Sequence, residues 1–118
     1  MHKADIEPVL LWENSSPNSS FTTLTNETIK STANYKYGLI YYKMYKTTMI
    51  LIQKVSFDVL NTASLTATEA YSGALNIYSR TITFNSATSI SIDHAYNKNG
   101  TQDDDRCIPI AIYGTNVL

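Results

Sequence analysis

The sequence consists largely of short runs in which apolar and polar side chains alternate, and turn-forming residues separate these runs. A period of two is typical of half-buried β-strands, because successive side chains on a strand point to opposite faces. The clearest run is YKYGLIYYKMY at residues 35–45. Alternation places two sets of side chains on opposite faces: Leu39, Tyr41, Lys43 and Tyr45 on one, and Ile40, Tyr42 and Met44 on the other. Because both faces carry large apolar groups, this run is predicted to be a central strand or a strand that faces a second subunit.

Similar runs predict strands over most of the remaining chain. They lie at residues 8–12, 21–29, 49–57, 75–84, 89–93 and 107–113. Thr47 and Thr48 are expected to join two strands in a hairpin, whereas residues 61–73 fit either a strand or a helical turn that ends in glycine. Residues 97–105, NKNGTQDDD, have the composition of a loop. Pro109 cannot donate a ladder hydrogen bond, which predicts an edge position or a bulge.

This pattern predicts an all-β fold, an antiparallel β-sandwich with a jelly-roll-like arrangement of seven to eight strands. At 118 residues the chain has the size of one domain, which we place at residues 8–118 after a short N-terminal extension at residues 1–7. The composition agrees, because Ser, Thr and Asn account for 37 of the 118 residues. These residue types compete with helical backbone hydrogen bonds, while threonine and the nine tyrosines suit strands.

The charge balance argues against two classes of partner. Nine basic and ten acidic residues give a net charge of −1, so the electrostatic attraction that drives binding to nucleic acids and anionic membranes is missing. We therefore expect no nucleic-acid partner and no membrane partner. The longest apolar stretch, residues 39–55, is interrupted by three lysines, and the N-terminus lacks the apolar core of a signal peptide.

Few residues follow the pattern of a catalytic or metal site. Cys107 is the only cysteine, and its isoleucine neighbours predict a small buried residue in a strand. The acidic run at residues 103–105 lacks the spacing of a calcium loop and is expected to be a solvated loop that pairs with Arg106 or a lysine. Asp93 and His94 would point to opposite faces of a strand. We expect no metal, no cofactor and no enzymatic activity.

Tyrosines and polar loops are the candidates for binding. Five of the nine tyrosines lie within residues 35–45, and tyrosine combines a large contact area with a hydrogen-bonding tip. Such a cluster suits sugar rings or a subunit interface. The candidate binding residues come from this cluster and from the polar loop: Tyr41, Tyr45, Asn97, Asn99, Asp103 and Asp104. Residues 14–20 form a second candidate loop.

The stretch LLWENSSPNSSF at residues 10–21 is predicted to be a corner rather than a ligand site. Trp12 and Phe21 are expected to pack as anchors on two successive strands. Asn14 and Pro17 would shape the chain between them.

Three segments resemble a group of small β-rich phage structural domains. These domains occur alone or at the C-terminal ends of tail-fibre and baseplate proteins of phages that infect Firmicutes and other gut bacteria. Their Trp-x-Asn-x-x-Pro-x-x-x-Phe opening is matched by Trp12, Asn14, Pro17 and Phe21. Residues 80–83, which begin with Arg80, resemble their Arg-Thr-Ile/Phe-Thr strand, and residues 108–114, which include Pro109, resemble their Ile-Pro-x-x-Ile-Tyr-Gly ending.

The resemblance implies a virion structural protein of the tail-fibre or baseplate type, which assembles in the host cytoplasm and acts by noncovalent adhesion. Its partners would be other virion proteins and further copies of the chain, with a trimer favoured. Host-surface glycan is a further candidate ligand. Three alternatives stay open at this point: a capsid-decorating (head-fibre) protein, a cellular carbohydrate-binding module, and a hydrolase.

Overall fold

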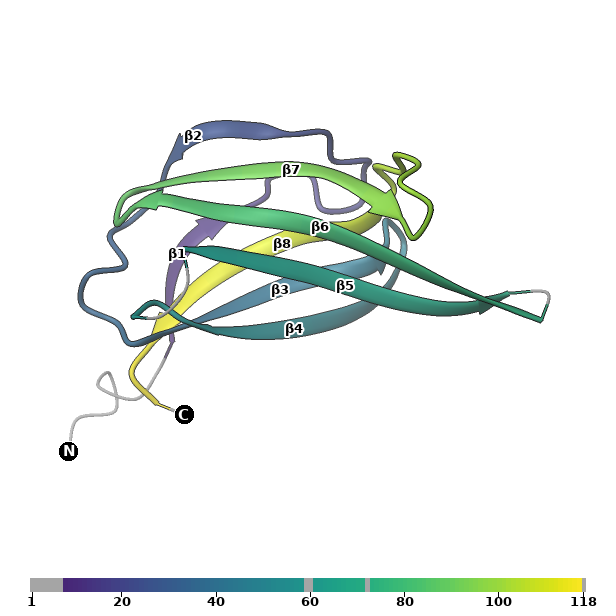
Figure 1. Cartoon of the computed structure of the whole chain (residues 1–118). Helices are drawn as coiled ribbons and strands as arrows, with labels where there is room; N and C mark the ends of the chain where they lie inside the picture. The colour runs from purple at the N-terminus through teal and green to yellow at the C-terminus, as the bar shows by residue number, and fades with distance from the viewer. Residues whose placement is uncertain (1–7, 59–60, 72, 118) are drawn as a thin grey trace.

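The computed structural model describes residues 8–58, 61–71 and 73–117, which form eight β-strands in two four-stranded sheets (Figure 1). The strands are β1 (Val9–Glu13), β2 (Leu24–Thr28), β3 (Tyr37–Tyr45), β4 (Thr48–Ser56), β5 (Thr62–Tyr71), β6 (Ala74–Ser86), β7 (Ser89–Asn97) and β8 (Arg106–Thr115). The predicted extension at residues 1–7 lies outside the described residues, as does Leu118. Within the described ranges, no helix is long and apolar enough to cross a membrane.

Each sheet combines strands from both halves of the chain. Sheet A has the order β1-β8-β3-β4, and sheet B has the order β2-β7-β6-β5. The predicted antiparallel β-sandwich is therefore confirmed. Its jelly-roll-like feature is the pairing of the first strand with the last in sheet A and of the second with the seventh in sheet B. The four strands in the middle of the chain form two hairpins, β3-β4 and β5-β6.

The core lies between the sheets and consists of the side chains that point inward at every second position of the strands. Its most completely buried large aliphatic residues are Ile40, Leu65, Ile82, Ile90, Ile92, Ile108 and Ile112. In β5, Ala63, Leu65 and Ala67 are buried, while the serine and threonine between them are exposed. This alternation confirms the strand interpretation of residues 62–71. The helical-turn alternative is wrong, because a period of two leaves no continuous helical face.

Pro109 lies in the middle of sheet A, because β8 pairs with β1 on one side and with β3 on the other. The predicted edge position is therefore wrong, and the predicted bulge is confirmed. The register between β3 and β8 shifts between Tyr41 and Tyr42, which lie opposite Ala111 and Pro109. A bulge interrupts the ladder locally, so a residue without a backbone N–H is tolerated there.

The second strand is shorter than predicted. β2 begins at Leu24, three residues after Phe21. The reason is that the backbone N–H of Phe21 donates to the carbonyl oxygen of Asp104 at 3.0 Å and does not join the ladder of sheet B. Residues 14–23 thus form a corner that carries the chain from sheet A to sheet B.

The two ends of the sandwich carry different parts of the chain. Val9 lies opposite Gly114, so β1 begins and β8 ends at the same end, which we call the proximal end. Tyr45 lies opposite Arg106, so the β3-β4 turn and the β7-β8 loop (residues 98–105) lie at the other end, which we call the distal end. The β5-β6 hairpin projects beyond the body of the sandwich at the distal end and forms an arm (Figure 1).

The burial of Cys107 leads to a prediction for stability at high pH. Cys107 is fully buried, as predicted, and burial raises the pKa of its thiol from 9.0 to about 11, although the charge of Arg80 opposes the shift. Between about pH 9 and 11 the folded chain therefore holds a proton that the unfolded chain has released. Ionisation of the thiol then favours unfolding, so stability is expected to fall as the pH rises through this window.

Urea denaturation across this pH range tests the expectation. Burial also raises the pKa of Tyr42, so part of the fall has another source. The Cys107→Ala variant should lose less stability over the window than the wild type does. Equal losses in the two proteins would contradict a role for the thiol.

Candidate functional site

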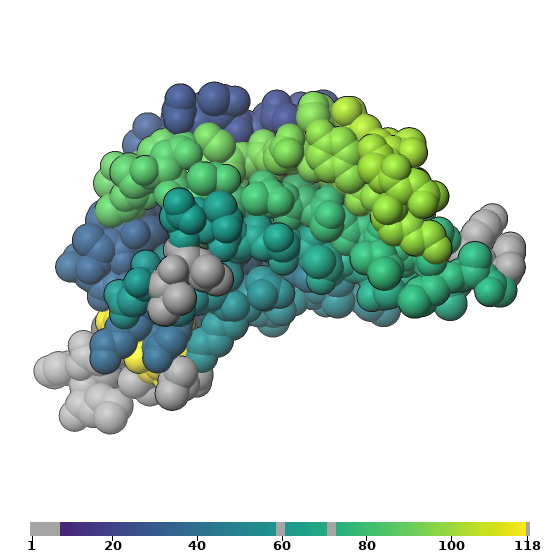
Figure 2. All heavy atoms as spheres, in the orientation of Figure 1, coloured from purple at the N-terminus to yellow at the C-terminus, as the bar shows by residue number. Residues whose placement is uncertain are grey.

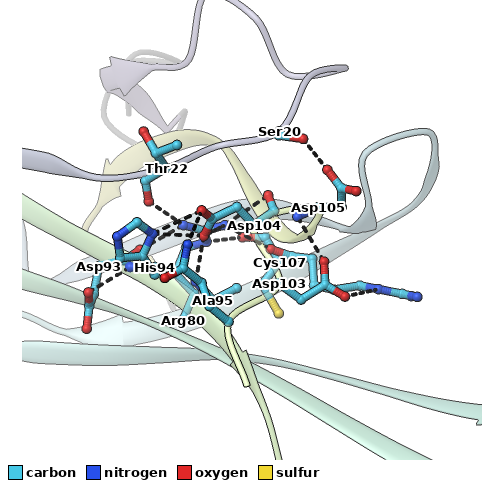
Figure 3. Close-up of polar contacts among 12 residues, drawn as sticks. Ser20, Thr22, Arg80, Asp93, His94, Ala95, Asp103, Asp104, Asp105 and Cys107 are labelled. Atoms are coloured by element: carbon cyan, nitrogen blue, oxygen red, sulfur yellow. Dashed lines mark hydrogen bonds and ion pairs between the residues drawn. The ribbon is translucent and has the colours of Figure 1, made fainter. Parts of the chain in front are cut away.

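Arg80 connects the distal loops to both sheets (Figure 3). It lies on β6, and its side chain has no exposed surface. Its guanidinium group donates hydrogen bonds to five backbone carbonyl oxygens: those of Asp93 at 2.7 Å, Thr22 and Cys107 at 3.0 Å, Arg106 at 3.1 Å and Asp104 at 3.3 Å. These acceptors belong to β7, the corner, β8 and the β7-β8 loop. One side chain thus holds four separate parts of the chain in place.

The buried charge of Arg80 is compensated chiefly by Asp104. Burial lowers the pKa of Arg80, and the carboxylate of Asp104, whose Oδ1 lies 4.0 Å from Nη2, is the strongest of the charges that oppose this shift. Asp104 also lies 3.0 Å from His94 Nδ1 and accepts a hydrogen bond from Gln102 Nε2 at 2.9 Å. The candidate binding residue Asp104 is therefore engaged within the base of the loop.

The two other aspartates of the acidic run face different cations. Asp103 Oδ2 lies 3.5 Å from Arg106 Nε, and Asp105 Oδ1 lies 3.7 Å from Lys46 Nζ. The pairing predicted for this run is therefore confirmed. Over the part of the chain that the structure describes, no group of three or more His, Cys, Asp or Glu side chains is arranged to hold a metal ion.

The corner between β1 and β2 packs against β8. Asn14 Nδ2 donates to the carbonyl oxygen of Pro109 at 2.8 Å. The rings of Trp12 and Phe21 meet edge to face, with their centroids 6.4 Å apart. Pro17 is half-buried within the corner. The four residues of the opening motif thus all lie in this corner. Arg80 of the second motif packs against it, because the guanidinium carbon of Arg80 is 5.2 Å from the centroid of the Phe21 ring.

A cleft opens between the two sheets at the distal end. It is lined by Tyr45 and Thr48 from the β3-β4 hairpin, by Glu69 and Ala70 from β5, and by Arg106 at the start of β8. We call it the Arg106 cleft. Its volume is about 390 Å³, within the range of roughly 300 to 1,000 Å³ that is usual for small-molecule sites.

Arg106 is held by two aromatic rings and two carboxylates. Its guanidinium carbon lies 4.7 Å from the centroid of the Tyr45 ring and 4.4 Å from that of Tyr78. Nη1 donates to Glu69 Oε2 at 2.9 Å, whereas the buried Nε makes no hydrogen bond to any described residue, although Asp103 Oδ2 lies 3.5 Å away. Burial disfavours the charge of Arg106, but the hydrogen bond to Glu69 and the nearby carboxylates outweigh it and raise the pKa of Arg106.

The structure separates the remaining candidate binding residues from this cleft. Tyr41 lies on the outer face of sheet A, where its ring packs edge to face on that of Tyr113 at 5.3 Å between centroids. Asn97 shapes the tip of the β7-β8 loop, because its Oδ1 accepts from the backbone N–H groups of Asn99 and Thr101 at 2.9 and 3.0 Å. The side chain of Asn99 is exposed on this tip. Of the six candidates, only Tyr45 and Asp103 thus meet at Arg106.

The sequence predictions missed four of the five residues that line the cleft. They included Arg106 only as a partner for the acidic run and Thr48 only as a turn residue, and they did not include Glu69 or Ala70. A local signal does exist for Thr48, which was predicted to lie in the hairpin turn and is instead the first residue of β4, paired with Tyr45. Glu69 lies 37 positions before Arg106, so only the packing of β5 on β8 brings the two side chains together.

A second, open groove lies on the outer face of sheet B. Its volume is about 420 Å³, and it lies between β2, β6 and β7. Hydroxyl groups dominate its lining, which includes Thr23, Thr25, Thr81, Thr83 and Ser91, together with Asp93. No aromatic side chain lines it, so it lacks the flat apolar surface that the Arg106 cleft has.

The Arg106 cleft can recognise a ligand without reacting with it. It combines an aromatic ring, a hydroxyl group, a carboxylate acceptor and a guanidinium donor in one small space. These are the groups that orient a polar ligand in a binding site. No known family model matches the chain, and no curated protein matches it either.

Proposed function

We propose that the chain is a noncovalent adhesion domain of a phage virion, of the tail-fibre or baseplate type, and that its distal end binds host-surface glycan. The observation that carries the proposal is the position of the Arg106 cleft. The cleft lies at the distal end, opposite the end at which β1 begins and β8 ends. Attachment through either strand would leave the cleft free to meet a surface.

The phage setting rests on the resemblance of three sequence segments. The first two segments build part of the distal end, because the opening motif forms the corner and Arg80 donates a hydrogen bond to it. A β-sandwich without disulfides also suits a protein that assembles inside a host cell. Because one fold can serve many functions, it is the cleft and not the fold that supports the binding role.

Assembly with further copies is the second part of the proposal. The outer face of sheet A carries Ile50 and Ile52, which are 60% and 56% exposed, and the half-buried rings of Tyr41 and Tyr113. The register places Ile52 next to Tyr41. A contiguous exposed apolar surface of this kind often marks a protein contact, and a trimer is the form that we favour.

Binding to cells tests the adhesion proposal. Fluorescently labelled protein is added to a panel of Gram-positive gut bacteria, with and without prior periodate oxidation of the cell surface. Periodate cleaves vicinal diols, so glycan-dependent binding should disappear after the treatment. Binding to a subset of strains that periodate abolishes would support the proposal. Binding to no strain would contradict it and would favour a capsid-decorating protein, which needs no receptor.

The mass in solution tests the assembly proposal. Light scattering should give three times the chain mass for the wild type, and the Ile52→Lys variant should shift the protein toward the monomer. Thr66→Lys is the matched control, because Thr66 is exposed on the outer face of sheet B. A monomeric wild type would contradict the trimer.

A further inference from the structure

We infer that the Arg106 cleft takes an uncharged saccharide unit, in preference to an anionic sugar or a phosphate group. This inference rests on the proposed function and deepens it, since it names the ligand class and the residues that contact it. Four features of the cleft support it: its shape, its charge balance, its hydrogen-bonding groups and its aromatic wall.

The shape of the cleft suits one or two small rings. One wall comes from sheet A, through Tyr45 and Thr48, and the opposite wall from β5 of sheet B, through Glu69 and Ala70. Arg106 lies on β8 between them. Figure 2 shows the arm of β5 and β6 extending beyond the body of the sandwich at this end. The cleft is therefore approached from the distal side, where a polymer chain can pass by.

The charges around the cleft exclude an anion as the preferred ligand. The positive charge of Arg106 faces both Glu69 and Asp103, at 2.9 Å and 3.5 Å. Lys46, a further cation at the distal end, is paired with Asp105 at 3.7 Å. Two cations and three carboxylates give this region a net charge of 2 − 3 = −1. A phosphate or carboxylate ligand would be repelled, while a cationic ligand would compete with Arg106 for its own carboxylates.

The hydrogen-bonding groups match adjacent hydroxyls. Glu69 and Arg106 present an acceptor and a donor side by side, joined at 2.9 Å. Neighbouring sugar hydroxyls can donate to the first and accept from the second, because each hydroxyl does both. Glu69 uses only Oε2 in the bond to Arg106, and the hydroxyl of Thr48 is exposed beside it. The cleft thus offers donors and acceptors without an unpaired charge.

The aromatic wall is rigid before any ligand arrives. Tyr45 packs on the Arg106 guanidinium group, which is itself backed by Tyr78. The half-buried Tyr45 ring provides an apolar surface for the C–H groups of a sugar. Because Arg106 and its two rings are already stacked, little side-chain freedom is lost on binding.

Titration followed by NMR tests the assignment. Amide spectra of the ¹⁵N-labelled protein are recorded with glucose, galactose, rhamnose and N-acetylglucosamine, and with glucuronate and inorganic phosphate. At least one uncharged sugar should shift the amides of residues 45–48, 69–70 and 106, with millimolar affinity. Glucuronate should bind more weakly than glucose. Shifts confined to the groove on sheet B or to the β7-β8 loop tip would overturn the assignment, as would a response to the anions alone.

Two variants separate recognition from folding. Glu69→Gln keeps the side-chain size but loses the charged acceptor, so affinity should fall about tenfold or more. Thr48→Val removes only an exposed hydroxyl and should weaken binding a few-fold. Glu13→Gln makes the same change at an exposed position of β1. It is the control and should leave affinity unchanged. Melting temperatures of all three variants should stay close to that of the wild type. Unchanged affinity in Glu69→Gln would overturn the inference.

The cell-binding assay distinguishes the two levels of the proposal. If the wild type binds cells in a periodate-sensitive manner and Glu69→Gln binds equally well, glycan adhesion stands and the Arg106 cleft is not its site. If the wild type binds no cells, the adhesion function itself fails. Loss of cell binding in Glu69→Gln, with Glu13→Gln unaffected, would support both.

Discussion

Replacing Arg80 with alanine is expected to remove a large part of the protein's free energy of unfolding. Arg80 donates hydrogen bonds to five backbone carbonyl oxygens and has no exposed side-chain surface. Its removal leaves those oxygens and the carboxylate of Asp104 without their cationic partner. Breaking a buried ion pair in this way costs about 3–5 kcal/mol, a large share of the roughly 5–15 kcal/mol by which a domain is stable.

Chemical denaturation measures this loss of stability, and two further variants show whether the hydrogen bonds of Arg80 are its cause. Arg80→Lys keeps the charge, but one ammonium group cannot reach carbonyls on all sides, so it should still lose about 2 kcal/mol or more. Lys30→Ala changes an exposed cation and should have almost no effect. If Arg80→Ala were as stable as Lys30→Ala, the five hydrogen bonds would not be what holds the distal loops.

Replacing Gly114 with alanine is expected to cost about 3 kcal/mol, at the upper end of the range for overpacked sites. A Cβ atom at this position would lie 2.6 Å from Cδ2 and 2.7 Å from Cγ of Tyr35, and 3.1 Å from a methyl group of Leu11. Cγ is close to the backbone of Tyr35, so a rotation of the ring cannot move it away. The backbone of β8 or of Tyr35 has to shift instead.

A double-mutant cycle tests the cause of this loss. In the Tyr35→Ala background the obstructing ring is absent, so Gly114→Ala should cost much less than in the wild type. Urea denaturation of the four proteins gives the coupling between the two positions. Additive losses would show that the ring contact is not responsible. Gly114 is the final residue of the third sequence motif. The close approach of Tyr35 explains why a residue without a side chain is needed at this position.

Local patterns were sufficient for the strands and the fold class. In β3, alternation placed Ile40 and Tyr42 on one face and Leu39 and Tyr41 on the other, and the structure buries the first pair more deeply than the second. Alternation gave a wrong strand boundary where an aromatic residue lies next to a strand but outside its hydrogen-bonded ladder. Phe21 was assigned to a strand but belongs to the corner, since its backbone N–H bonds to Asp104.

The site was predicted less well than the fold. Tyr45 and Asp103 were chosen for their residue types and both contact Arg106. Asp104 was chosen for the same reason, but it faces His94 inside the loop. Consecutive residues of one acidic run thus take different roles, and residue type alone cannot tell them apart.

The all-β class, most of the strand positions and the burial of Cys107 could be predicted from the sequence, because these depend on the alternation of neighbouring side chains. Which strands are neighbours, and therefore the contacts of Arg106 with both Glu69 and Tyr45, depends on the tertiary structure. The same holds for Pro109, whose bulge lies in the centre of sheet A. Strand order depends on how two whole sheets pack, and no periodicity within a single strand carries that information.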